Sequence, residues 1–149
     1  MINDIITGTC NKLKEAFGEG YGIYAENQPQ GFREPCFFIT CVNCVERPVS
    51  GTRRSRMYSV SVSVGYRPES KTGPLAECHD ISDGLFNALL FIAVGDEQIT
   101  GTNMSSDFGE GMLEFTVVYD VIVETDNESE MMGELFATLG KNKIIKEIV

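Results

Sequence analysis

Three of the five cysteines follow the spacing Cys36-x4-Cys41-x2-Cys44. With Cys78 downstream, this spacing matches the plant-type iron–sulfur motif. Cluster ligands need an irregular loop whose thiolates converge on the iron. The residues between these cysteines instead alternate as in a β-strand, which directs Cys36 and Cys41 to opposite faces. A zinc site would lack a good second pair of ligands, because His79 is the only histidine. We therefore predict buried cysteines that pack as small hydrophobes, and neither a metal nor a cofactor.

No catalytic constellation emerges from the rest of the chain. Cys78 and His79 are adjacent on a predicted helix, where neighbouring side chains point about 100° apart, so they cannot form a nucleophile–base pair. The glycines of segment 18–22 resemble a dinucleotide-binding loop. That fingerprint needs a strand before it and a helix after it, and here the order is reversed. We predict that the protein is not an enzyme.

A cluster of basic residues is a more specific feature than these cysteine and glycine patterns. Four of the chain's six arginines lie within ten residues at the turn of a predicted hairpin: Arg47, Arg53, Arg54 and Arg56. One interpretation is a solvated turn. The other is a contact surface for an acidic partner, such as the acidic side of an identical subunit. An acidic segment offers a counterpart: Glu124, Asp126, Glu128, Glu130 and Glu134.

Length and composition favour one soluble domain over residues 1–149. The chain is 42% hydrophobic, and its net charge of −10 argues against general binding to nucleic acid, which needs clustered cations. The longest apolar stretch, 85–94, is too short to span a bilayer, so we expect no membrane association. An odd number of cysteines without a secretion signal is typical of reduced thiols in a cytosolic setting.

Hydrophobic periodicity predicts an ordered series of elements. We expect a helix over 2–17, a short edge strand over 21–25, a loop over 26–34, strands over 36–46 and 56–66, a helix from Pro74 to the Gly95-Asp96 stop, strands over 97–107 and 112–124, an acidic loop over 125–130 and an ambiguous tail over 131–149. Strand 36–46 carries apolar residues at both alternations, so we expect it to be central and covered on both faces.

These elements predict an α+β fold: a mainly antiparallel sheet with a long hairpin, and two helices packed on one of its faces. Asn3 or Asp4 is the expected N-cap of the first helix, and Gly18 its end.

One segment carries a family resemblance. Gln30-Gly-Phe-Arg-Glu-Pro-Cys-Phe-Phe-Ile39 is a turn-like stretch that leads through Pro35 into an apolar strand, after a helix and the segment Tyr21-Gly-Ile-Tyr24. With strand 58–66, helix 81–90 and strand 113–123, it resembles the small phage tail terminator proteins found in prophages of Gram-positive bacteria. These are packing and turn patterns, not chemical motifs.

The resemblance implies a structural protein of a virion or phage-tail-like particle, assembled in the host cytoplasm. Its expected partners are identical subunits in a ring, a hexamer by family analogy, together with the tail tube protein and the neck or, in contractile tails, the sheath. The ring would cap the tail tube and stop its polymerisation. The hairpin tip (47–56) and the acidic segment (124–134) would make subunit or tube contacts, and 126–149 would be a docking tail.

The sequence also allows other functions. A tube protein or a head-completion protein would share the same patterns. A cysteine-ligated metal protein is a weaker alternative. A small-ligand binding module would need a cleft with convergent polar groups, which the sequence does not assemble.

Overall fold

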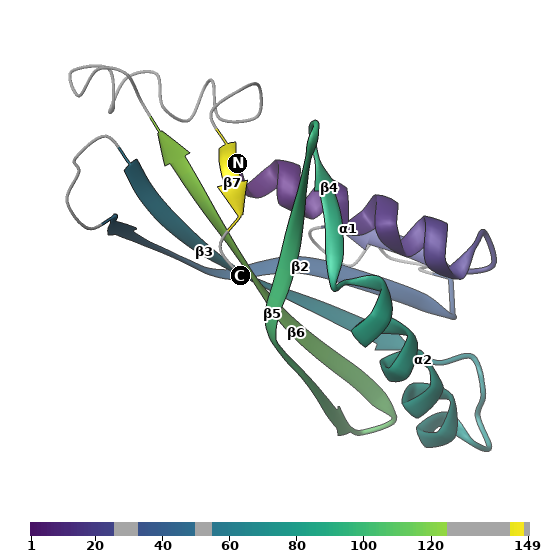
Figure 1. Cartoon of the computed structure of the whole chain (residues 1–149). Helices are drawn as coiled ribbons and strands as arrows, with labels where there is room; N and C mark the ends of the chain where they lie inside the picture. Colours follow the sequence, from purple (N-terminus) through teal and green to yellow (C-terminus); the bar gives the residue numbers. More distant parts are fainter. Residues whose placement is uncertain (26–32, 50–54, 125–143, 148–149) are drawn as a thin grey trace.

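The computed structural model describes residues 1–25, 33–49, 55–124 and 144–147 (Figure 1). The elements are α1 (Ile2–Phe17), β1 (Gly22–Ala25), β2 (Cys36–Pro48), β3 (Ser55–Arg67), α2 (Pro74–Ala88), β4 (Phe91–Val94), β5 (Glu97–Gly109), β6 (Met112–Glu124) and β7 (Ile144–Glu147). The strands form one sheet in the order β1-β2-β3-β6-β5-β4, with β7 beside β6. All pairs are antiparallel except β1–β2. The predicted α+β fold with its long β2–β3 hairpin is confirmed.

Alternation along β3 and β6 divides the sheet into two faces. On each strand every second side chain is buried: Tyr58, Val60, Val62, Val64 and Tyr66 on β3, and Leu113, Phe115, Val117, Tyr119, Val121 and Val123 on β6. Their rows face the two helices and form the core. The residues that alternate with these core residues along each strand, such as Ser61 and Thr116, are small or polar and point to the other face of the sheet. Among the described residues no helix covers this second face, which we call the helix-free face.

Helix α1 packs on the sheet through Ile5 and Leu13, which are fully buried. A Cβ on Gly8 would lie 2.5 Å from the carbonyl oxygen of Ala93, so only glycine lets the helix approach β4 this closely. The helix ends at Gly18, whose φ is 84°. The predicted side-chain N-cap was wrong. Met1 occupies that position, and no side chain caps the helix.

Helix α2 ends earlier than its periodicity predicts. It stops at Ala88, and the apolar residues that follow belong to β4, which turns at Gly95 (φ 62°) into β5. Two hydrogen bonds stabilise the end of α2, where the chain leaves the helix and enters β4. The Tyr119 hydroxyl donates to the Leu89 carbonyl at 2.8 Å, and the Gly101 amide donates to the Leu90 carbonyl at 2.6 Å. These donors are distant in sequence, so local periodicity could not reveal them.

The start of α2 is held by the carboxylate of Glu77. It accepts hydrogen bonds from the Tyr66 hydroxyl at 2.6 Å and from the amides of Glu69 and Ser70 at 2.8 and 2.9 Å. Partial burial on its own would raise the pKa of Glu77, but these hydrogen bonds outweigh it and lower the pKa below its ordinary value. The carboxylate therefore fastens the β3–α2 loop to the sheet.

Strand β2 departs from the expected regular alternation. The register against β3 shifts between Cys41 and Asn43, which marks a β-bulge. Before the bulge, Ile39 is buried in the core. After it, Val45 stands opposite Ser59 and therefore faces away from the helices. The expectation that β2 is covered on both faces was wrong, because only its first four residues are buried.

Candidate assembly surfaces

The second half of β2 is exposed at one end of the sheet. β1 pairs with β2 only as far as Ile39, so beyond that residue β2 pairs with β3 alone among the described strands. Val42 is 64% exposed and Val45 is 50% exposed. An exposed edge with apolar side chains is a template for contact with another chain. This half-strand is the first candidate assembly surface.

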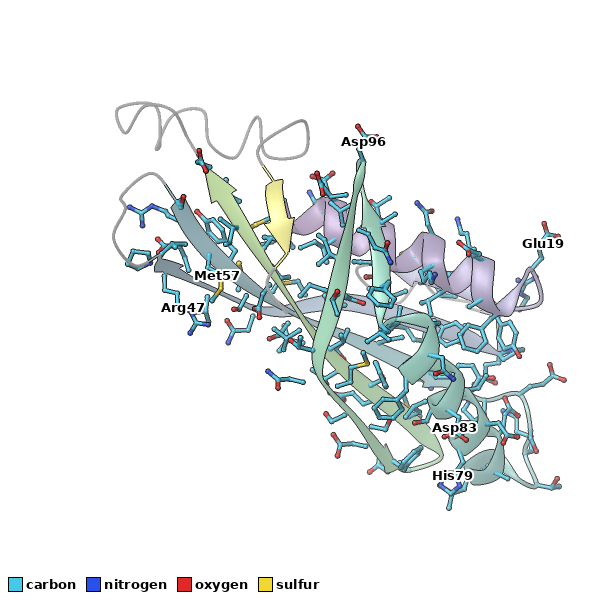
Figure 2. All side chains as sticks on the ribbon, in the orientation of Figure 1. Glu19, Arg47, Met57, His79, Asp83 and Asp96 are labelled. Carbon is cyan, nitrogen blue, oxygen red and sulfur yellow. The ribbon has the colours of Figure 1, made fainter. Side chains whose placement is uncertain are left out.

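Strands β2 and β3 end at the hairpin tip (47–56), of which residues 47–49 and 55–56 are described. The Val49 amide donates to the Ser55 carbonyl at 3.1 Å. Arg56 forms an ion pair with Glu46 at 2.7 Å. Arg47 is exposed at the same end of the sheet as Met57 (Figure 2). None of the ion pairs between described residues includes Arg47. The other two predicted arginines, Arg53 and Arg54, lie outside the described residues.

The acidic segment begins beside this tip. Glu124, the last residue of β6, stands opposite Ser55 on β3 and is exposed. The structure thus brings Glu124 and Arg56 to the same end of one sheet. The remaining acidic positions of the prediction, Asp126, Glu128, Glu130 and Glu134, lie outside the described residues.

A second surface lies at the opposite end of the sheet, on the helix-free face. A hollow of about 530 Å³ opens there, and Gly65 leaves its floor without a side chain. Phe38 and Met112 contribute apolar walls, while the carboxylates of Asp107 and Glu114 line another side. We call this feature the acidic hollow.

Sequence analysis missed the acidic hollow because its residues come from four strands. One signal could have found part of it. Glu110 and Gly111, with φ of 53° and 73°, form the two-residue turn between β5 and β6. Counting outward from such a turn places Asp107 directly opposite Glu114, as observed.

Comparison with known protein families finds a match to a family described as phage tail terminator protein, over residues 4–131. The chain belongs to the phage tail terminator family. No curated protein matches this chain. One solved structure aligns with 12% identity and a TM-score of 0.40, covering 85% of this chain and 97% of its own.

As a phage tail terminator family protein, the chain is a structural component of a virion or tail particle with a role in tail completion. The family is structural rather than enzymatic, and its members interact with other tail proteins. No helix in the described part of the chain is long and apolar enough to span a bilayer.

The cysteines of this terminator family protein do not converge on a metal site. No three His, Cys, Asp or Glu side chains within the described ranges form a group that could hold a metal ion. Cys41 and Cys44 stand opposite the core residues Val62 and Val60, whereas Cys36 is on the other face, opposite Arg67. The predicted opposition of Cys36 and Cys41 is confirmed, and the bulge moves Cys44 to the face of Cys41.

Burial affects the ionisation of four of the cysteine thiols. It is the main cause that raises the pKa of Cys10, Cys36, Cys44 and Cys78 above the ordinary value of 9.0. A raised pKa disfavours the thiolate, which is the form that binds metal or attacks carbon.

The predicted separation of Cys78 and His79 is also confirmed. Cys78 is fully buried. His79 is exposed, and its ring contacts the Phe108 ring edge-on, with centroids 4.8 Å apart.

Proposed function

We propose that this protein closes into a ring that caps the tail tube, ends tube polymerisation and joins the tail to the neck, or to the sheath where the tail is contractile. The observation that carries the proposal is the family match over residues 4–131. A homohexamer is the stoichiometry we propose, and assembly would take place in the host cytoplasm.

The surfaces proposed for contact are the hairpin tip and the acidic segment 124–134. Two features of the described residues support this. Arg47 and Glu124 are exposed at one end of the sheet. The adjoining half of β2 carries Val42 and Val45 in solvent, an arrangement that a subunit or tube contact would cover.

Deleting the gene from a phage or prophage that encodes this protein tests the proposal. We expect tail tubes of uncontrolled length that do not join heads, and normal tails when the wild-type gene is supplied from a plasmid. Tails of normal length and normal attachment in the deletion strain would overturn the proposal. Electron microscopy of the particles gives tube length and attachment in one measurement.

A further inference from the structure

We propose that the acidic hollow of one copy receives the hairpin tip of the next copy, with Arg47 placed against the carboxylates of Asp107 and Glu114. This inference deepens the ring proposed above and rests on it. It names the two surfaces that would meet at each subunit boundary.

The shape of the acidic hollow suits an arginine side chain. Its volume of about 530 Å³ leaves room for a long side chain and part of the adjoining strand. The wall from Met112, which is partly exposed, can pack against an aliphatic stem, while a guanidinium reaches the carboxylates. Gly65 matters because any side chain there would project from the floor of the hollow.

Three carboxylates line the acidic hollow. Asp107, Glu110 and Glu114 line it, and none forms an ion pair with a described residue. One cation lies close by, since the guanidinium of Arg67 stands 5.8 Å from the centre of the Phe38 ring. The local balance is therefore negative and complementary to the hairpin tip, where Arg47 is exposed and has no ion pair with a described residue.

The two surfaces lie at opposite ends of the same sheet. Along β3, Arg56 marks the tip end and Gly65 the hollow end, and Figure 2 shows Arg47 and His79 far apart at these ends. A contact between different surfaces of identical subunits is heterologous, and it generates a ring when the rotation closes. Glu124 lies at the tip end, so it cannot be the acceptor in a contact between opposite ends. The acidic hollow lies at the other end of the sheet and can accept the hairpin tip.

A charge swap tests the contact between Arg47 and Glu114. Arg47→Glu reverses the tip, and Glu114→Arg reverses the hollow. Each variant alone should fail to restore normal tails in the deletion strain, and its assembly in solution should weaken at least tenfold. When both variants are expressed together, the two kinds of subunit can alternate around the ring. Each subunit boundary then pairs a basic and an acidic side chain at positions 47 and 114, so capping should return. The double variant in one chain should also regain it.

A matched control for Glu114→Arg is Asp96→Arg, which makes the same charge change at the exposed β4–β5 turn, away from both surfaces. It should cap tails as the wild type does, and circular dichroism should show that all variants are folded. Either single variant capping normally on its own would overturn the proposed contact, as would a mixture that fails to restore capping. If the wild-type protein itself does not cap tails, the proposed function fails instead, so the two failures are distinguishable.

Discussion

Asp107 on β5 and Glu114 on β6 are direct cross-strand partners on the helix-free face. Like charges placed directly opposite each other destabilise an antiparallel sheet. Neither carboxylate forms an ion pair with a described residue. A cation from a second copy would relieve this repulsion, which links the arrangement of the acidic hollow to assembly.

Replacing Glu114 with Gln should therefore stabilise the isolated subunit while it weakens assembly. We expect the free energy of unfolding to rise by a few tenths of a kcal/mol, since solvent screens exposed charges. Urea denaturation measures the change, and Glu19→Gln, in the exposed turn that follows α1, is the control. A clear loss of stability in Glu114→Gln would contradict this account of the pair.

The carboxylate of Glu77 should contribute a pH-dependent part of the stability. Its pKa is lowered in the folded protein, so its contribution is fully present above pH 4.5, the ordinary value, and is lost as the pH falls through the lowered pKa. We expect Glu77→Gln to cost about 1.5–3 kcal/mol at pH 7, because two backbone amides and a hydroxyl lose a charged acceptor. The difference from wild type should shrink in acid.

Chemical denaturation at a series of pH values between 3 and 7 measures this dependence for Glu77. The control is Glu69→Gln, which removes a carboxylate from an exposed side chain of the same loop. A destabilisation of Glu77→Gln that is the same at pH 3 and pH 7 would show that the charge of Glu77 is not responsible.

Gly101 should not tolerate alanine. A Cβ at this position would lie 2.6 Å from the Leu89 carbonyl oxygen and 2.7 Å from a methyl carbon of Val117, both nearer than real contacts allow. We expect Gly101→Ala to lower the free energy of unfolding by about 1–3 kcal/mol. Gly109→Ala is the matched control on the same strand, since nothing lies within 4 Å of its added carbon. Equal stability of the two variants would contradict the close packing of Gly101 against the end of α2.

The arginines at positions 53 and 54 give a prediction that follows from the sequence alone. Replacing Arg53 and Arg54 together with Glu should leave the fold intact and block ring formation, because the tip would lose its positive charge. Circular dichroism tests the fold, and electron microscopy of complemented tails tests the ring. Normal capped tails made by the double variant would show that these two arginines are not a contact surface.

Patterns that depend on neighbouring residues could be predicted from the sequence. The serine–valine alternation of β3 places Val60 and Val62 in the core wherever the strand pairs, because side chains alternate every residue. The turn at Glu110 and Gly111 is also local, since it depends on the positive φ of these two neighbouring residues.

Features that depend on distant residues could not be predicted. The end of α2 at Ala88 requires hydrogen bonds from Tyr119 and Gly101, which are far along the chain. The bulge after Cys41 shifts Val45 to the helix-free face, and the sequence could not locate it because apolar residues occupy both alternations of this strand. The acidic hollow joins Phe38 to Glu114 across three strands, so only the sheet order reveals it.

The most direct test of the central claim is the assembly state of the purified protein at high concentration. Negative-stain electron microscopy shows the shape of the particles, and light scattering gives their mass. The account predicts closed rings of about six subunits. Long stacked tubes would contradict it and indicate a tube protein. A monomer that also fails to cap isolated tail tubes would contradict it as well.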